Sequence, residues 1–210
     1  MAKNEIADKR TRKRLEILRS AAAAFRHRGY HGASVDAIAR TLHMTKGNLY
    51  YYFKNKEEIL YFCHDYSLGL LSNVLKGVEA SNDPPAVKLR KLVVKFVEMI
   101  IDELHGTALT LDLEALSPAR LRKIIARRDK FDRGLRRVIQ SGMDAGSFRK
   151  SDPKLVSFAI LGSMNWIPRW FDPRGPAHSE EIGSAFADYF IAGLLEPGNS
   201  RPKAAKVNEE

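Results

Sequence analysis

The sequence contains a single cysteine in 210 residues, so the chain can form no internal disulfide. That residue, Cys63, lies within an apolar run, and we expect a buried, inert thiol and not a redox sensor. A fold that does without disulfides suits a reducing compartment. We therefore expect to find the protein in the cytoplasm.

Long apolar runs are also missing. The most apolar stretch, residues 155–171, includes Asn165, Pro168 and Arg169 and falls short of the roughly 20 residues that a helix needs to cross a bilayer. The N-terminal residues are charged and no apolar segment follows them directly, unlike a secretory signal peptide. We expect no membrane partner, and we expect residues 155–171 to form a buried helix.

Signatures of catalysis are lacking as well. The sequence has no HExxH, paired CxxC, Walker glycine loop or Gly-x-Ser-x-Gly motif. Its six histidines are scattered along the chain, at His27, His31, His43, His64, His105 and His178. We therefore expect neither an enzyme nor a bound metal or cofactor.

Strand-like alternation and internal repeats are missing too, which predicts an all-α fold.

What the sequence has in excess is positive charge. Its formal net charge is +10, and residues 1–56 alone contain thirteen lysines and arginines against four acidic residues. An excess concentrated in one part of a chain favours a polyanionic partner. The basic run Lys9–Arg14 is either a solvated tail or an arm that contacts phosphates or a minor groove.

Two short helices are expected within this basic part. Ser34 is a good N-cap for the first, whose apolar residues Val35, Ile38, Ala39 and Leu42 recur at helical spacing. Thr45 is a good N-cap for the second, which Leu49 and Phe53 would anchor on one face. The reversal between them needs a residue near the left-handed region, and His43 is one of the few non-glycine types that tolerate it. This arrangement is a helix-turn-helix.

The second of these helices directs polar and aromatic groups outward. It offers a cation, an amide and phenol hydroxyls at its N-terminal half, from Lys46, Gly47, Asn48, Tyr50, Tyr51 and Tyr52. Such groups suit contacts with phosphates and base edges in a major groove. We expect this helix to read DNA.

Residues 32–39 and 45–58 together resemble the N-terminal domain of the tetracycline-repressor (TetR) family, over a pattern that extends from Leu15 to Leu60. His43 departs from that pattern, since most members carry glycine there. The resemblance implies base-edge or groove-floor contacts for Lys46, Gly47, Asn48 and Tyr51. It implies phosphate contacts for another set of residues, namely Ser34, Thr45, Tyr50, Tyr52 and Lys56.

We expect two domains and a tail. Residues 1–55 would form an N-terminal arm and a three-helix DNA-binding domain, in which residues 1–9 are disordered and Gly29 stops the first helix near Arg28. A long helix from Lys56 to about Val78 would join it to a helical body, residues 56–196. Residues 197–210 would be a disordered tail. About nine helices are expected in all.

The helices expected in the body follow from proline, glycine and serine positions. They would span residues 85–105, 107–116, 117–145, 153–170 and 179–195. The 153–170 helix is apolar on nearly every face, so it should be buried all round, in a core or between subunits, and Pro168 should kink or end it. The family resemblance implies a homodimer formed by the last two helices, on a palindromic operator with reader helices roughly 34–36 Å apart.

The same resemblance implies a small-molecule effector, and the stretch from Asn165 to Pro176 is similar to the family subset that responds to acyl-CoA thioesters. Trp166 and Trp170 would form aromatic walls, or would instead pack in the core or at the dimer interface. Cations for the CoA phosphates would come from Arg169 and from the basic 117–138 segment, which includes Arg120 and Arg127 and could also be a solvated face.

Other functions stay open. A lipophilic drug or an aromatic acid is the next candidate effector. A nonspecific architectural nucleic-acid-binding protein would also explain the charge, although it would not need a groove-reading helix. A carrier of apolar ligands would leave the N-terminal charge unexplained. Whether the regulator represses or activates does not follow from the sequence, and repression is the usual sense of the family.

Overall fold

The computed structural model describes residues 2–103 and 112–196. Within these ranges the regular structure is helical apart from one isolated bridge between Phe148 and Leu195, which confirms the expected all-α fold. The eight α-helices are α1 Ala2–Gly32, α2 Val35–Thr41, α3 Lys46–Tyr52, α4 Lys56–Ala80, α5 Pro85–Glu98, α6 Pro118–Asp144, α7 Pro153–Trp170 and α8 Ser179–Leu194. No helix in these ranges is long and apolar enough to cross a membrane.

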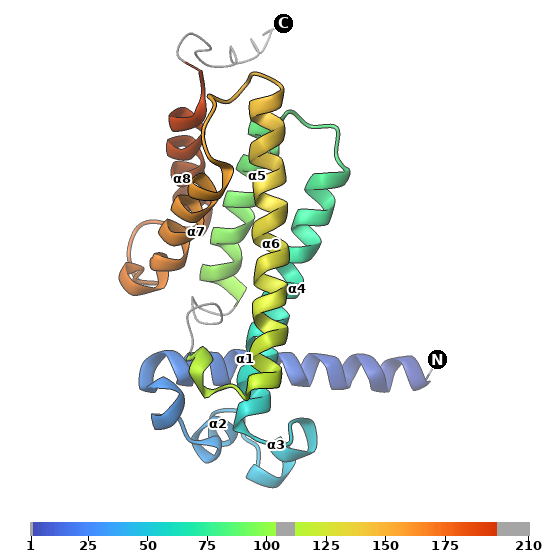
Figure 1. Ribbon diagram of the computed structural model, residues 1–210. Coiled ribbons are helices and arrows are strands. Elements are labelled where there is room, and N and C mark those ends of the chain that lie inside the picture. The colour runs from blue at the N-terminus through green and yellow to red at the C-terminus, as the bar shows by residue number, and fades with distance from the viewer. Residues whose placement is uncertain (1, 104–111, 197–210) are drawn as a thin grey trace, which may run out of the picture.

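The helices form a small head and a larger body joined by α4. Figure 1 shows α1 lying across the lower part of α4, with α2 and α3 below it, the body helices α5, α7 and α8 above it, and α6 extending from the body down to the level of α1. Helix α4 packs against α1 at its start and against α5 and α6 along the rest of its length. Helix α4 is therefore shared by the head and the body.

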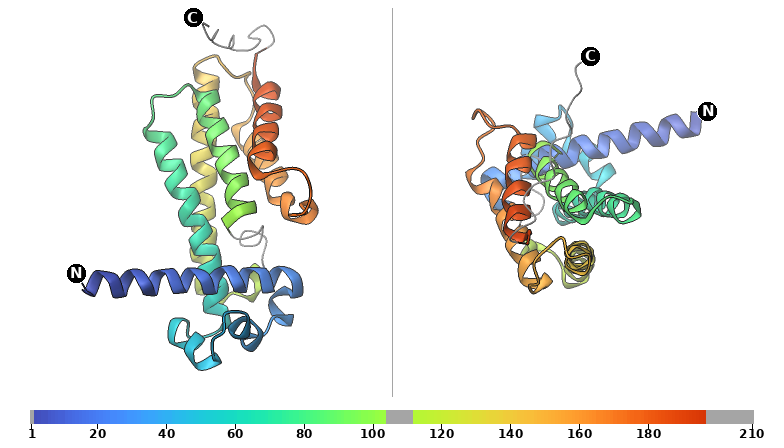
Figure 2. Two further views of the ribbon diagram at one scale, coloured as in Figure 1. Left: turned by 180° about the vertical axis from the view of Figure 1, so that it is seen from behind. Right: turned by 90° about the horizontal axis from the view of Figure 1, so that it is seen from above.

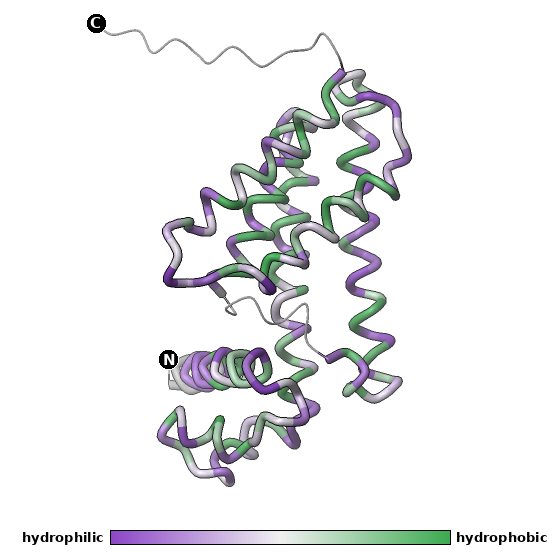
Figure 3. The backbone as a smooth tube through the Cα atoms, turned by 90° about the vertical axis from the view of Figure 1, so that its left-hand side faces the viewer, coloured by the Kyte–Doolittle hydropathy of each residue, from purple (hydrophilic) through white to green (hydrophobic). Residues whose placement is uncertain are grey.

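Helix α1 begins much earlier than expected. Residues 2–9 are helical and continuous with the rest of α1, whereas the sequence suggested disorder for residues 1–9. Figure 2 shows this end projecting well beyond the other helices, and Figure 3 shows that many of its residues are hydrophilic. The ion pair between Arg12 and Asp8, one turn apart at 2.5 Å, adds a small local stabilisation.

Gly29 interrupts α1 as expected, but the helix resumes for one more turn. The glycine adopts φ 66° and ψ 168°, a conformation that L side chains rarely adopt, and the segment then continues to Gly32. The chain is thereby redirected towards Ser34 and α2. Tyr30, in that last turn, packs against Phe25 at a ring-centroid distance of 5.6 Å.

The body differs from expectation at the end of α5. The α-helix stops at Glu98 and passes into a π-helical turn, Met99–Glu103, where a regular helix to residue 105 was expected. The predicted helix over residues 107–116 lies mostly outside the described residues. Its described part holds only a 3₁₀ turn, Leu113–Ala115, so eight α-helices replace the expected nine in the part of the chain that the structure describes.

Within the single chain, helix α7 is not buried all round, and its burial between subunits stays a prediction. One face, with Ser157, Ile160, Met164 and Ile167, packs into the body. Four large apolar side chains elsewhere on the helix are 49–65% exposed, those of Leu155, Phe158, Trp166 and Trp170. Pro168 does not end the helix early, because it lies in the final turn and the helix continues to Trp170.

Candidate DNA-binding surface and effector cavity

Two buried side chains hold the reader helix α3 on the head. Leu49 and Phe53 are 0% and 1% exposed, and both belong to the core that α1 and α4 complete. The Asn48 backbone N–H donates to Thr45 Oγ1 at 3.1 Å, which confirms the predicted N-cap. The opposite face of α3 is thereby fixed towards solvent.

The reversal between α2 and α3 uses the predicted left-handed residue. His43 adopts φ 53°, and apart from glycines it is the only described residue with positive φ. The Met44 N–H donates to Ala39 O at 2.9 Å and the His43 N–H donates to Arg40 O at 3.0 Å, which closes the end of α2. The turn is therefore built with a histidine in the left-handed region.

The predicted DNA-contacting side chains of α3 share the outward face. Lys46, Gly47, Asn48, Tyr50 and Tyr51 are exposed, and Tyr51 is the most exposed of the tyrosines there, at 69%. The half-buried Tyr52 meets Tyr51 edge to face, with ring centroids 5.2 Å apart.

The basic run of α1 lies close to this face. The guanidinium of Arg10 lies 5.5 Å from the ring centroid of Tyr51, which links the exposed surface of α1 with the reader helix. Arg14 lies 4.9 Å and 4.5 Å from the rings of Phe53 and Phe62, so this cation packs on the head itself. The run thus contains at least one residue with a structural contact, and it is not simply a solvated tail.

Lys46 is held by a neighbour on α2. Its Nζ lies 2.9 Å from Asp36 Oδ2, and this hydrogen bond, followed by the charge of the carboxylate, raises the pKa of Lys46. The pair is about half exposed and water competes for both partners, so it is weak. Contact with a base edge would require Lys46 to leave Asp36.

Lys56 is engaged more completely. Its Nζ donates to the carbonyl oxygens of Tyr30 at 2.8 Å, Ala33 at 3.0 Å and His31 at 3.4 Å, and it lies 4.4 Å from the centroid of the Tyr30 ring. An ammonium group has three N–H donors, and all three are used here. The phosphate contact expected for Lys56 stays a prediction, and it would have to displace one of these carbonyls.

Ser34 has a capping role that leaves it able to bind an anion. Its Oγ accepts a hydrogen bond from the Ala37 N–H at 3.0 Å, which confirms the predicted cap of α2. The side chain is exposed and the hydroxyl proton remains available as a donor. A phosphate could therefore be bound without loss of the cap.

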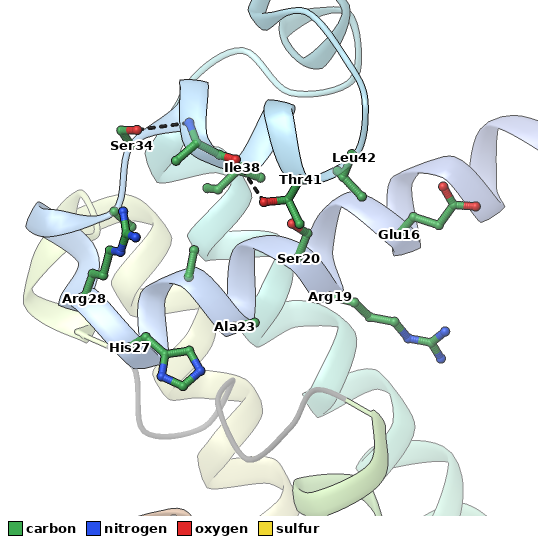
Figure 4. A pocket seen from close by; sticks show the side chains of 13 residues that line it. Glu16, Arg19, Ser20, Ala23, His27, Arg28, Ser34, Ile38, Thr41 and Leu42 are labelled. Atoms are coloured by element: carbon green, nitrogen blue, oxygen red, sulfur yellow. Dashed lines mark hydrogen bonds between the residues drawn. The ribbon is translucent and has the colours of Figure 1, made fainter.

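A groove of ≈ 580 Å³ lies between α1 and α2 in the head. Figure 4 shows Glu16 and Arg19 at one end of it and His27 and Arg28 at the other. Small side chains form much of its lining, namely Ser20, Ala23, Ala24, Ala33, Ser34 and Ala37. The groove forms because these small side chains leave space between the two helices. Ser34 is the only predicted DNA-contacting residue in its lining.

A network of hydrogen bonds joins the head to the start of α6. The Tyr30 N–H donates to Asp112 Oδ2 at 3.0 Å, and the Ser117 N–H donates to Glu57 Oε1 at 2.8 Å. Arg120 pairs with Glu57 at 3.0 Å and lies 5.7 Å from the ring of Tyr61. The bond from Ser117 is the main cause that lowers the pKa of Glu57, and Arg120 adds to it. We call these contacts the head–body junction.

Four of the nine cations of the predicted mouth on α6 pair with carboxylates, namely Arg120, Arg127, Arg136 and Arg137. Besides Arg120, Arg127 pairs with Asp65 of α4 and Arg137 pairs with Glu79. These ion pairs tie α6 to α4, and two of the five residues suggested for the effector, Arg120 and Arg127, take part in them. These paired cations therefore serve helix packing in the structure.

A separate cavity of ≈ 210 Å³ lies between α4, α5, α6 and α7. We call it the body cavity, and its lining consists of Leu68, Leu71, Phe96, Arg128, Asp129, Phe131, Asp132, Phe158, Leu161 and Asn165. None of the five residues suggested for the effector is in this lining. Trp166 and Trp170 are 62% and 49% exposed on α7, with the Arg169 guanidinium 5.8 Å from the Trp166 ring.

Sequence reasoning missed the polar residues of the body cavity. Arg128 lies within the basic segment that was noted only as a whole, and Asn165 begins an aromatic stretch whose tryptophans are the more conspicuous residues. Each is a single residue in a long helix, and only the packing of four helices shows that they face one cavity. Cys63, by contrast, is buried as expected, and burial raises the pKa of its thiol.

Family models match most of the chain. Residues 17–61 match the bacterial regulatory proteins of the tetR family, and residues 82–194 match the tetracyclin repressor-like C-terminal domain. Among curated relatives, the HTH-type transcriptional repressor KstR2 of Mycolicibacterium smegmatis is 27% identical over 192 residues, which cover 88% of this chain and 91% of the relative. The uncharacterized regulator YhgD of Bacillus subtilis is 26% identical, with coverages of 87% and 96%.

Solved structures agree with this assignment. The TetR family regulator PfmR from Thermus thermophilus is 34% identical, with a TM-score of 0.77 over 86% of this chain and 99% of that one. KstR2 of Mycobacterium tuberculosis, a ketosteroid transcriptional regulator, is 26% identical, with a TM-score of 0.80 and coverages of 88% and 96%. AibR in complex with isovaleryl coenzyme A and operator DNA is 28% identical, with a TM-score of 0.71 and coverages of 88% and 99%.

The matched models cover both the reader head and the body, and the relatives are matched over nearly their full lengths. The structural features that agree with the family are the capped helices α2 and α3, the outward face of α3 and the long helix α4. The chain is therefore a helix-turn-helix transcriptional regulator of the tetracycline-repressor family.

Proposed function

We propose that the protein is a homodimeric repressor that binds a palindromic operator and is released from it by a small effector. The observation that carries the proposal is the exposed polar face of α3, fixed from behind by Leu49 and Phe53. A rigid helix that presents such a face suits a major groove.

The division of roles on DNA follows the geometry of α3. The side chains of Asn48 and Tyr51 are exposed on the outward face, where they suit base edges. Thr45 lies at the helix N-terminus, where backbone N–H groups favour an anion, and it suits a phosphate. Base-edge or groove-floor contacts would also come from Lys46 and Gly47, and further phosphate contacts from Tyr50, Tyr52 and Ser34. Lys56 would contribute chiefly by holding the head together.

The dimer would form through the outer faces of α7 and α8. These faces expose Leu155, Phe158, Trp166, Trp170 and Tyr189, with Tyr189 75% exposed. An apolar surface of this kind is unusual on a monomer and commonly marks an interface. Two-fold pairing would allow the two reader helices to meet successive major grooves on one side of a duplex.

A CoA thioester is the effector that we propose, because AibR, a similar protein, forms a complex with isovaleryl coenzyme A and operator DNA. Trp166, Arg169 and Trp170 would lie at the edge of the proposed dimer interface, where aromatic rings and a cation are exposed together. Arg120 and Arg127 could contribute only after releasing Glu57 and Asp65. A lipophilic or aromatic effector is the alternative, and the apolar lining of the body cavity favours it.

Selection of bound sequences from a random duplex pool, with and without a mixture of acyl-CoAs, tests these points together. A palindrome that is recovered without thioesters and lost in their presence supports both the operator and the effector. Recovery of the same palindrome with and without thioesters would support the DNA-binding regulator and exclude the thioester as its effector. Binding that weakens with salt but enriches no sequence would favour an architectural protein instead.

A further inference from the structure

The N-terminal part of α1 passes beside the reader helix. Arg14 packs on the head, 4.9 Å from the ring of Phe53 and 4.5 Å from that of Phe62. One turn earlier, the guanidinium of Arg10 lies over the ring of Tyr51, 5.5 Å from its centroid. Tyr51 belongs to the exposed face of α3, so α1 carries Arg10 to the surface that the reader helix presents.

The side of α1 on which Arg10 lies is distinct from the side that carries its neighbouring ion pair. Successive residues of an α-helix are turned by about 100°, so residues four apart differ by about 40° and residues two apart by about 200°. Arg10 and Arg14 therefore share the side that faces the reader helix. Arg12 lies on the opposite side, where it pairs with Asp8 at 2.5 Å.

Arg10 is exposed and ready to donate hydrogen bonds. No carboxylate among the side chains that the structure describes pairs with it, and its contact with Tyr51 uses the face of the guanidinium and leaves the N–H groups in the plane. The lysines expected near the reader helix are held more firmly. Lys46 would have to leave Asp36, and Lys56 would have to release a carbonyl oxygen.

The distance between Arg10 and Tyr51 matches the geometry of a major groove. The groove is about 12 Å wide, so each of its walls lies roughly 6 Å from a side chain in its middle. The phosphates of the two strands form these walls. A guanidinium 5.5 Å from the ring of a groove-reading tyrosine is therefore at the distance of a backbone phosphate.

We propose that Arg10 binds a backbone phosphate at the edge of the groove that Tyr51 enters, which makes the N-terminal part of α1 a second DNA-contacting element beside α3. The inference rests on the proposed function, because it takes α3 as the reader helix. The planar guanidinium matches two phosphate oxygens while its face stays on the phenol ring. Since a phosphate is the same in every sequence, the contact adds affinity for all duplexes alike.

The salt dependence of DNA binding measures this contact. Binding of the full chain to the selected palindrome and to a mixed-sequence duplex is followed by fluorescence anisotropy between about 50 and 200 mM salt. Arg10→Met is expected to reduce the steepness of log K against log salt concentration by about 0.9 for each bound head, and to weaken both duplexes by the same factor. Arg12→Met removes the same charge from the opposite side of α1 and is expected to leave the slope unchanged.

Several results would overturn the proposal. An unchanged slope in Arg10→Met is one, and an equal reduction in Arg10→Met and Arg12→Met is another, since net charge would then be the cause. A loss confined to the palindrome would show that Arg10 acts only by holding the Tyr51 ring. Arg10→Lys keeps a cation at this exposed position and should keep the slope, so a slope reduced as much as in Arg10→Met would also contradict a phosphate contact.

Selection of bound sequences separates this proposal from the proposed function. If no palindrome is enriched, but Arg10→Met still reduces the slope on the mixed-sequence duplex, the phosphate contact is supported and the sequence-reading regulator is excluded. If a palindrome is enriched and Arg10→Met leaves the slope unchanged, the regulator is supported and the phosphate contact is excluded.

Discussion

Replacing Lys56 with methionine distinguishes a structural lysine from a phosphate-binding one. Methionine keeps the unbranched apolar stem and removes the ammonium group that donates to the carbonyls of Tyr30, His31 and Ala33. These carbonyls belong to the end of α1 and the link to α2. Without the ammonium group, this link loses all three of these bonds to α4.

The expected loss of stability is about 2 kcal/mol. A hydrogen bond to a charged group contributes roughly 1.5–3 kcal/mol, and water can replace part of the loss because the site is only half buried. Denaturant-induced unfolding followed by circular dichroism measures this difference. Lys54→Met is the matched control, since Lys54 is an exposed lysine two residues away, and its change should stay within about 0.5 kcal/mol.

The same variant gives a second readout on DNA. A lysine bound to a phosphate contributes roughly 0.9 to the slope of log K against log salt concentration. We expect Lys56→Met to bind every duplex more weakly with an unchanged slope, because the head is loosened and no phosphate contact is lost. Unchanged stability with a slope reduced by about 0.9 would refute the structural role and restore the phosphate contact.

Three further predictions concern reading, packing and pH. Asn48→Ala or Tyr51→Ala should lower the ratio of operator to nonspecific affinity in competition assays, by about 1–3 kcal/mol where a base contact is lost, and an unchanged ratio would exclude base readout. Gly134→Ala should lower the free energy of unfolding by about 1–3 kcal/mol, because its Cβ would lie 2.2 Å from Leu75 Cδ2, and a wild-type melting temperature would contradict this packing. Burial, and then a neighbouring cation, lower the pKa of His64 from 6.5 to about 3, so the unfolded state binds the extra proton between these values. Stability should therefore be unaffected by His64 above about pH 6.5 and fall by about 1.4 kcal/mol per pH unit below it, and His64→Phe should flatten that part of the pH profile.

The reader head could be predicted because its signals are local. Ser34 and Thr45 cap helices through atoms three residues away, and the buried pair Leu49 and Phe53 follows helical spacing. His43 was identified because few residue types tolerate its backbone conformation. In each case the relevant interaction spans only a few residues.

Two of the predictions that were wrong or incomplete depended on contacts between distant segments. Composition alone describes α7 as apolar on nearly all sides, but only its packing shows which face is covered and which is exposed. From the sequence, Arg120 and Arg127 appear only as part of a basic segment. The structure shows that they pair with Glu57 and Asp65 of α4, which are about 60 residues away along the chain. Helix formation at residues 2–9 was missed because a polar segment with few apolar residues gives no periodic signal.

The head–body junction has a consequence for folding. The bond from Tyr30 to Asp112 joins residues 82 positions apart and supplies the head with a partner that residues 1–55 do not contain, while the bond from Ser117 to Glu57 ties the first turn of α4 to the start of α6. A fragment limited to those residues would also lose Lys56 and the part of α4 that covers Phe53. We therefore expect residues 1–55 alone to be less stable than the same residues are in the full chain.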